Sequence, residues 1–461
     1  MKHTRRAPEK AITVDPIPRL VVSLAIPSAI SLLITSCYHL TDTYFISSIG
    51  TTATAAVSIN GTLEQSITMF GTFLCVGASS YIARNIGANN REKASQTLST
   101  SFFYGLAIGF IIMVLGLLFL EPLVRFLGAT PELLPYCKDY AKYVLAVAPF
   151  MIANFVTNKC LCSEGSTLFA MFGTGIGAIL NVFLDPLFIF TLDLGIRGAS
   201  IATAISKLIS FCVLLLPYLR RRSMLRISLS RVSFPRDIVM EICRMGSPSF
   251  LRVLFTNLSA ILLNRLAGGY SPAVLAGIAS SNRIMILVGT FISGLGQGFQ
   301  PVAGQNWGAK LFDRVRKSYW FTTLLSAGLM LVFGAVLFIC APRIMQIFTE
   351  DGPDAEMIRT GVLLIRLQCI VLPVHAWVII TTMGYNSTGK ALGSAILSLS
   401  RQGICYIPML LLLPRLWGGS GLAAAQATAD ALSALVALPL TVSFLKDIRR
   451  RSQPSCADAK L

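Results

Sequence analysis

Apolar residues run along the chain in long stretches, separated by short breaks rich in charged residues, proline or glycine. Each stretch reaches the roughly 20 residues that a helix needs to cross the hydrocarbon core of a bilayer. The stretches cover residues 20–46, 53–82, 95–120, 135–158, 168–191, 196–218, 241–265, 274–301, 317–341, 357–381, 391–414 and 419–445. This pattern predicts an all-α membrane protein with twelve transmembrane helices. The first stretches are longer than a perpendicular crossing requires, so their helices must tilt, kink or project beyond the bilayer.

The chain divides into two similar halves. Residues 219–236 form the most basic segment between two stretches and leave six stretches on each side. A constant offset of 221 positions pairs Pro27 with Pro248, Ser28 with Ser249, Thr35 with Thr256, Gly77 with Gly298, Asn85 with Asn306, Gly87 with Gly308 and Ala88 with Ala309. Because each half has an even number of helices, the repeats are parallel and their pseudo-twofold axis lies along the membrane normal. We therefore predict an N-lobe at residues 1–218, a cytoplasmic basic linker at 219–240 and a C-lobe at 241–461, with a binding site in the midplane cleft between the lobes.

The paired prolines stand inside the first helix of each half. Proline removes a backbone donor, so Pro27 and Pro248 predict symmetric kinks. The alternative is the ordinary tolerance of proline in membrane helices.

Charged residues in the loops predict the topology. Loops that follow even-numbered stretches, together with the C-terminal tail, carry Arg84, Arg91, Lys93, Arg220, Arg221, Arg222, Arg226, Arg231, Arg236, Lys310, Arg314, Arg316, Lys317, Lys446, Arg449, Arg450 and Arg451. Residues 349–356 (TEDGPDAE), on the predicted opposite side, are acidic. Basic loops stay in the cytoplasm, so both termini are expected to be cytoplasmic.

The composition excludes several classes of protein. Apolar residues make up 54% of the chain and charged residues only 13%, whereas an average soluble domain has about 25% charged residues. The net charge of +18 comes largely from short loops and so does not indicate nucleic-acid binding. The chain has neither a Walker A loop nor an H-E-x-x-H motif among its three histidines. We therefore expect neither direct use of ATP nor an intramembrane enzyme.

Most of the eleven cysteines fall in or beside apolar stretches and are expected to be small packing residues. Cys160 and Cys162 lie next to Glu164, and a metal site is an alternative interpretation of this trio. The second pair of ligands that a zinc site requires is not present there.

Four acidic residues lie within the apolar stretches: Asp42, Glu64, Asp185 and Asp430. An ionised carboxylate costs about 3 kcal/mol or more at the centre of a membrane helix, so such groups usually face a cavity, a partner or an ion. Asp42 stands toward the outer end of its stretch, and a solvated helix end is the alternative there. Glu64 and Asp430 are expected to pair with intramembrane arginines, which are Arg252, Arg265, Arg283, Arg366 and Arg401.

Those arginines have a second interpretation, which is snorkelling to the interface or salt bridging between the lobes. Among them, Arg283 is the one expected to face a cavity.

Asp185 has the clearest set of neighbours. Asn181 precedes it by four residues, which places the amide and the carboxylate on one helical face. Pro186 weakens the backbone hydrogen bonding one turn earlier, and Thr203 on the next stretch adds a hydroxyl. Oxygen ligands of this kind suit a small hard cation or a shared proton, and a structural hydrogen-bond cluster is the alternative.

The chain resembles the MATE (multidrug and toxic compound extrusion) family over nearly its whole length, and most closely its MepA-like bacterial branch. The resemblance rests on Pro27 with Asp42, the turn at residues 87–89, residues 181–190 (NVFLDPLFIF), residues 195–203 (GIRGASIAT) and the repeated turn at residues 306–309. It implies the twelve-helix, V-shaped MATE bundle and a rocker-switch antiporter, in which entry of sodium or protons drives efflux.

The resemblance also assigns roles to residues. It implies a cation site at Asp42, Asn181, Asp185 and Thr203, and a cavity lined by Tyr38 and Asn154. Another branch of the family has an acidic residue in the seventh helix, where this chain has Arg252, Asn257 and Asn264, so a cation site in the C-lobe is not expected.

The expected substrates are lipophilic cations and other drugs, since a wide apolar cavity with a few carboxylates attracts them without demanding one shape. The expected location is the bacterial cytoplasmic membrane, with no cofactor besides the coupling ion and no obligatory protein partner. A lipid-linked oligosaccharide flippase is the alternative. A flippase would need a strongly basic cavity for pyrophosphate, which the paired N-lobe carboxylates oppose.

Overall fold

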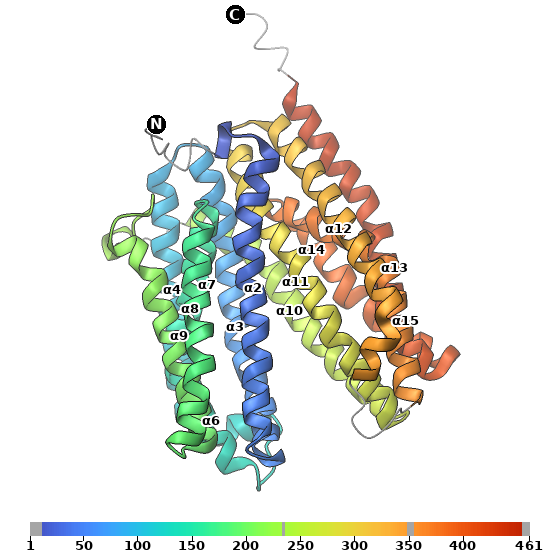
Figure 1. Cartoon of the computed structure of the whole chain (residues 1–461). Helices are drawn as coiled ribbons and strands as arrows, with labels where there is room; N and C mark the ends of the chain where they lie inside the picture. Colours follow the sequence, from blue (N-terminus) through green and yellow to red (C-terminus); the bar gives the residue numbers. More distant parts are fainter. Residues whose placement is uncertain (1–11, 233–235, 348–354, 454–461) are drawn as a thin grey trace, which may run out of the picture. The chain divides into compact units, whose positions relative to one another are not determined.

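A computed structural model describes residues 12–232, 236–347 and 355–453 (Figure 1). In these ranges the chain is helical and contains no strand, which confirms the all-α prediction. The helices before residue 232 are α2 (Ile17–Ser47), α3 (Thr51–Gly87), α4 (Arg91–Leu118), α5 (Leu120–Phe126), α6 (Leu134–Ala146), α7 (Ala148–Ser163), α8 (Thr167–Pro186), the π-helical turn η1 (Leu187–Thr191), α9 (Gly195–Leu219) and the 3₁₀ turn η2 (Leu229–Arg231). Those after residue 235 are α10 (Arg236–Gly268), α11 (Pro272–Gly308), α12 (Phe312–Ile347), α13 (Ala355–Ser387), α14 (Ala391–Leu399), the π-helical turn η3 (Ser400–Ile404) and α15 (Tyr406–Ser452).

The described helices account for the twelve predicted crossings. Ten continuous helical runs are long and apolar enough to span a bilayer, and the pair α6 and α7, bent by 50°, makes a further broken span. The run Ala391–Ser452 counts as two crossings, because the backbone leaves helical geometry at Trp417 and Gly418. Gly418 has a φ of +58° and a ψ of −139°, a conformation that residues with a Cβ avoid.

Several helices extend past the apolar stretches that predict them. The stretch at residues 274–301 ends well before α11 does, at Gly308. Gln305 and Asn306 in this last part are fully buried although they are polar. The Asn306 side chain donates to the carbonyl oxygens of Val302, at 2.8 Å, and Ile12, at 3.3 Å. A bond within the helix and a tertiary bond to Ile12 therefore satisfy this buried polar side chain where hydropathy alone indicates the end of the helix.

The chain forms two compact units, which are described separately below. Unit 1 contains Ile26–Gly246 and unit 2 contains Ile12–Ala25 together with Ser247–Leu461. The first turns of α2 thus pack within unit 2, where Val21 and Leu24 form a small apolar cluster with Val302. The first turns of α10 pack within unit 1, where Ile238 and Ile242 join the main core.

Glycines at matching positions of the two halves allow these helix starts to pack closely. A Cβ on Gly77 would lie 2.5 Å from the carbonyl oxygen of Ile242, and a Cβ on Gly298 would lie 2.5 Å from the backbone of Ala25. Gly77 and Gly298 are related by the offset of 221 positions that relates the two sequence halves. The same type of close backbone contact is therefore built once in each unit.

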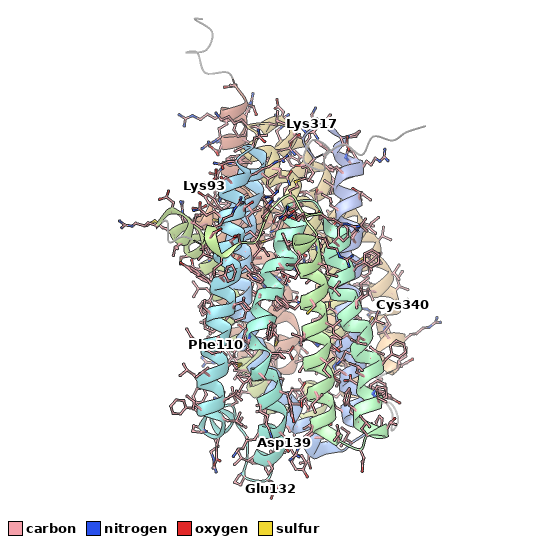
Figure 2. All side chains as sticks on the ribbon, turned by 90° about the vertical axis from the view of Figure 1, so that its left-hand side faces the viewer. Lys93, Phe110, Glu132, Asp139, Lys317 and Cys340 are labelled. Carbon is pink, nitrogen blue, oxygen red and sulfur yellow. The ribbon has the colours of Figure 1, made fainter. Side chains whose placement is uncertain are left out.

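Figure 2 shows the side chains along the length of unit 1. Lys93 lies toward one end of the unit and Glu132 and Asp139 lie toward the other, while Phe110 projects outward between them. More than half of the Phe110 side chain is exposed, in company with other large apolar side chains on the outer surface of α4. An apolar exterior of this kind suits contact with lipid.

Candidate functional site

The candidate ion site of unit 1 is built on α8 and α9. Asn181 and Asp185 lie one turn apart on α8, and the Asn181 amide donates to Asp185 Oδ1 at 3.1 Å. The same amide lies 3.5 Å from the hydroxyl oxygen of Thr203 on α9. All three side chains are almost completely buried. The structure therefore brings together the amide, carboxylate and hydroxyl that the sequence places at these positions.

A glycine contact brings α8 and α9 close enough for this arrangement. A Cβ on Gly177 would lie 2.7 Å from Ser210 Cβ and 2.9 Å from the carbonyl oxygen of Ser206, both on α9. The next residue after Asp185 is Pro186, and the chain then continues as the π-helical turn η1. π-Helical turns of this kind frequently accompany functional sites.

Asp42 on α2 completes a pair of carboxyl groups. Its side chain is only 9% exposed and lies within hydrogen-bonding reach of the Asp185 side chain. Asp42 Oδ1, Asp185 Oδ2 and Asn181 Oδ1 are buried, and each has no hydrogen-bond partner among the described residues. Two buried carboxylates that face each other repel strongly unless they share a proton or bind a cation. The chemistry of these oxygens fits either a proton or a small hard cation.

Tyrosine and lysine side chains border this carboxyl pair. Tyr38 is buried one turn before Asp42 on α2, and the Tyr140 hydroxyl on α6 is hydrogen-bonded with Thr203. Lys207, one turn after Thr203 on α9, forms a 3.1 Å ion pair with Glu64 on α3. Its Nζ also lies 5.6 Å from the centre of the Tyr38 ring.

Glu64 therefore pairs with a lysine, and the expectation of an arginine partner is wrong for this residue. The sequence does contain a signal for the lysine. Lys207 is an intramembrane charge four residues after Thr203, so it lies on the same face of the helix. Tyr140 carries no comparable signal, because its contact with Thr203 joins residues far apart in the sequence.

The other two predicted cavity residues, Asn154 and Arg283, belong to different units. The Asn154 side chain on α7 donates to the Ser210 hydroxyl on α9 at 2.9 Å, so it links two helices of unit 1. Arg283 belongs to unit 2, where it is exposed on α11.

Unit 2 contains a buried ion pair of its own. Asp430 on α15 is 1% exposed and accepts hydrogen bonds from Arg401 Nε at 2.7 Å and from Gln426 Nε2 at 3.1 Å. Arg401 lies in the π-helical turn η3. The prediction that Asp430 pairs with an intramembrane arginine is confirmed. With Arg401 beside it, the Asp430 carboxylate is already neutralised.

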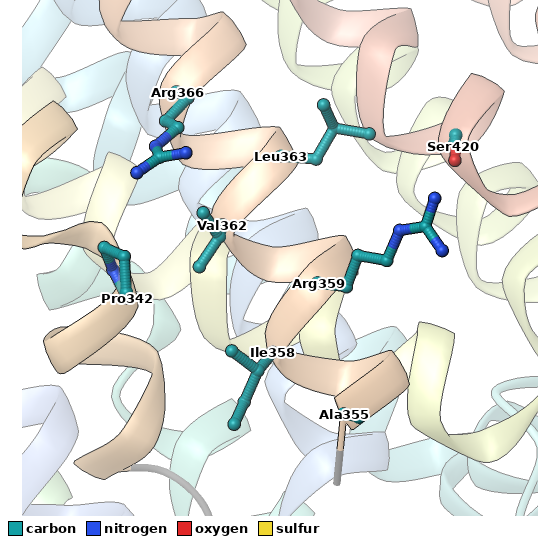
Figure 3. A pocket seen from close by; sticks show the side chains of 8 residues that line it. All are labelled: Pro342, Ala355, Ile358, Arg359, Val362, Leu363, Arg366 and Ser420. Atoms are coloured by element: carbon teal, nitrogen blue, oxygen red, sulfur yellow. The ribbon is translucent and has the colours of Figure 1, made fainter. Parts of the chain in front are cut away.

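A cavity of about 610 Å³ also lies in unit 2 (Figure 3). Its lining comprises Pro342, Ala355, Ile358, Arg359, Val362, Leu363, Arg366 and Ser420. Arg366, one of the predicted intramembrane arginines, donates to the carbonyl oxygen of Phe338 at 3.4 Å and stacks 5.1 Å from that ring. Among the described residues, the lining contains two arginines and no carboxylate.

Glu164 anchors the segment that follows α9. The carboxylate is fully buried and accepts hydrogen bonds from the Ser223 hydroxyl, the Met224 backbone N–H and the Tyr218 hydroxyl. Burial raises the pKa of the Glu164 carboxyl to about 7. The carboxylate of Glu164 is thus held by these partners and not by the thiols of the neighbouring cysteines. In the described ranges, no three His, Cys, Asp or Glu side chains are placed to hold a metal ion.

Comparison with known proteins identifies related chains. The sequence model of the MatE family matches residues 27–187 and 248–412. The multidrug export protein MepA of Staphylococcus saprophyticus is 26% identical over 428 residues, which make up 93% of this chain and 94% of the relative.

Solved structures are similar over almost the whole chain. A crystal structure of a MATE protein in complex with MaL6 has a TM-score of 0.91 at 25% identity and covers 96% of this chain and 100% of that chain. A MOP superfamily transporter from Pyrococcus furiosus has a TM-score of 0.89 at 25% identity, with 98% and 100% covered. The binding pocket of the Pyrococcus protein has a reversed polarity that suggests a different function for it.

Proposed function

The chain belongs to the MatE family, and we propose that it is a secondary active multidrug exporter, which exchanges an inward-moving cation for outward-moving small molecules by alternating access. The names of its relatives support drug export, since the Staphylococcus proteins that match over more than nine-tenths of the chain are multidrug export proteins. The role is that of a transporter and not of an enzyme.

The observation that carries this proposal is the buried carboxyl pair of Asp42 and Asp185. Both side chains lie within hydrogen-bonding reach of each other, and Asn181 and Thr203 provide further oxygen atoms. One proton or one sodium ion relieves the repulsion between the two carboxylates. The direct approach of the carboxyl groups favours the proton, because a shared proton requires no additional space.

Exchange follows from competition for this negative charge. When the coupling ion joins the proton that Asp42 and Asp185 share, the remaining negative charge of the pair is neutralised and the attraction for an organic cation is weakened. Asp42 lies on α2, which contains Pro27, so loading the pair is proposed to bend or repack this helix. Release of the ion restores the negative charge and allows the next substrate to bind.

The proposed substrates are lipophilic and often cationic drugs. Carboxylates surrounded by apolar and aromatic side chains, such as Tyr38, attract organic cations through charge and ring contacts. No cofactor besides the coupling ion and no obligatory protein partner is proposed. A flippase for a pyrophosphate-linked lipid would need a basic cavity, whereas three carboxylates and one lysine surround the candidate site of unit 1.

The proposed location is the bacterial cytoplasmic membrane, with both termini in the cytoplasm. The basic residues of unit 1 support this orientation. Lys93 lies toward one end of the unit (Figure 2), and the basic segment after α9, with Arg220, Arg221 and Arg222, is joined to that end through the hydrogen bond from the Arg226 N–H to Ser95.

Ethidium efflux from proteoliposomes tests the proposal, with pH and sodium gradients imposed separately. The wild type is compared with Asp42→Asn and Asp185→Asn, which keep the size of each side chain and remove its charge. Glu92→Gln, an exposed carboxylate at the start of α4, is the matched control. We expect one gradient to drive efflux in the wild type and in Glu92→Gln but not in the two aspartate variants. Efflux by neither gradient in the wild type would contradict the proposed function.

A further inference from the structure

Lys207 places a positive charge beside the carboxylates of unit 1. Its Nζ lies 3.1 Å from Glu64 Oε1 and 5.6 Å from the centre of the Tyr38 ring. The side chains of Lys207 and Glu64 are 27% and 19% exposed. Lys207 also interacts electrostatically with Asp42. The ammonium group is therefore held among the groups of the candidate ion site and does not extend to the membrane interface as snorkelling lysines do.

Three helices fix this position. Lys207 follows Thr203 by four residues on α9, so both side chains share one face of that helix. Glu64 comes from α3 and Tyr38 from α2. An aromatic face stabilises an ammonium by about 0.5–2 kcal/mol, which adds to the attraction of Glu64. Two independent contacts thus keep the charge of Lys207 in the site.

The charges of the site can be counted from these contacts. Asp42 and Asp185 approach within hydrogen-bonding reach, so the pair retains a single negative charge when it shares a proton. The charge of Glu64 is offset by Lys207. The site therefore presents one net negative charge to a substrate. A monocation balances that charge, whereas a dication leaves one positive charge uncompensated in a poorly solvated site.

We propose that Lys207 is a specificity-determining residue that restricts the site of unit 1 to monocationic substrates. The inference rests on the function proposed above, because it requires organic cations to bind near Asp42 and Asp185. Removal of the ammonium leaves Glu64 as a second negative charge and turns the preference toward dications. The chemical class selected by this chain is thus set by a lysine outside the carboxyl pair.

Ethidium and propidium are a matched pair of probes. They share the phenanthridinium ring, and propidium carries an additional quaternary ammonium. The measurement is the dissociation constant of each dye for the purified full-length protein in detergent, obtained from dye fluorescence at fixed pH and salt. The readout is the ratio of the two constants, in which general effects of a substitution on binding largely cancel.

Variants of the ion pair shift this ratio in opposite directions. Loss of one charge about 10 Å from the second ammonium, at an effective dielectric constant of about 20, corresponds to roughly tenfold in affinity. We expect Lys207→Met to favour propidium by roughly this factor relative to the wild type. Glu64→Gln is expected to disfavour propidium by a similar factor. The double variant, which removes both charges, is expected to return to the wild-type ratio, and Lys207→Arg to retain it.

Lys142→Met is the matched control, because Lys142 forms a 3.1 Å ion pair with Asp139 elsewhere in unit 1. Its ratio is expected to equal that of the wild type. If Lys207→Met does not fold, Glu64→Gln tests the inference, because its ratio of dissociation constants is expected to shift against propidium. This inference alone would be overturned if the wild type binds ethidium and the variants of Lys207 and Glu64 keep a ratio of dissociation constants within about twofold of the wild-type ratio. A wild type that binds neither dye would overturn the proposed function and this inference with it.

Discussion

The buried ion pair of unit 2 gives a prediction that does not depend on transport. Asp430 is 1% exposed and is held by Arg401 at 2.7 Å and Gln426 at 3.1 Å. Arg401→Met removes the arginine charge and leaves the carboxylate buried with one neutral donor. Breaking a buried pair from one side costs about 3–5 kcal/mol, because the remaining charge is uncompensated. We expect Arg401→Met to lower the free energy of unfolding by this amount.

The double variant Arg401→Met with Asp430→Asn separates the cost of an unpaired buried charge from the contribution of the ion pair to the free energy of unfolding. It loses a charge-assisted hydrogen bond, which contributes about 1.5–3 kcal/mol, but it leaves no unpaired charge. We therefore expect the double variant to be more stable than Arg401→Met alone, with a coupling energy of about 2 kcal/mol or more between the two sites.

Unfolding in a graded mixture of dodecyl maltoside and sodium dodecyl sulfate, followed by circular dichroism, measures these differences. Arg451→Met is the control, because the Arg451 side chain is 52% exposed in its ion pair with Asp447. Exposed pairs of this kind contribute about 0.5 kcal/mol or less. The reasoning is refuted if Arg401→Met costs no more than the control, or if the effects of the two substitutions at the buried pair simply add.

Two further predictions concern the segment after α9 and the glycine contacts. Burial raises the pKa of the Glu164 carboxyl from 4.5 to about 7. Between these two pH values the carboxyl ionises when it is exposed by unfolding but stays protonated in the folded protein. The free energy of unfolding therefore falls by up to about 3 kcal/mol as the pH rises through this range, and it is not regained at higher pH. Thermal unfolding midpoints of the wild type are therefore expected to fall over this range relative to those of Glu164→Gln, and a constant difference between the two proteins would contradict this account. A Cβ at Gly298 would lie 2.5 Å from the backbone of Ala25, so Gly298→Ala is expected to cost about 1–3 kcal/mol of stability. Gly289→Ala in the same helix meets nothing within 4 Å and is expected to be neutral or slightly stabilising, so equal midpoints for the two variants would be evidence against the close contact.

The transmembrane helices could be predicted from the sequence because lipid requires long apolar stretches. Hydropathy could not show where the helices end, since α11 continues through buried polar residues such as Asn306, whose side chain bonds to Val302 within the helix and to the distant Ile12. It also could not show the 50° bend between α6 and α7 within the stretch at residues 135–158. That bend depends on how the two segments pack, although Pro149 near the start of α7 is a local cue.

The neighbours of Asp185 could be predicted because helical periodicity places Asn181 one turn away and Thr203 follows on the next helix. The spacing of Lys207 from Thr203 predicts that both share one face of α9, but the sequence contains no local pattern for its partner Glu64, which lies on α3. The role of Glu164 could not be predicted, because its partners Ser223 and Met224 lie about 60 residues further along the chain. Contacts between distant segments are fixed by tertiary packing and have no local pattern.

The central claim is that Asp42 and Asp185 hold the ion that is exchanged for substrate. Its most direct test is the pH change of a weakly buffered solution when ethidium is added to the purified protein, measured with and without sodium. The account predicts that the wild type releases protons in proportion to the dye bound, or binds the dye more weakly as sodium is raised, and that Asp185→Asn shows neither effect. Dye binding by the wild type with no proton release and no sodium dependence would contradict it.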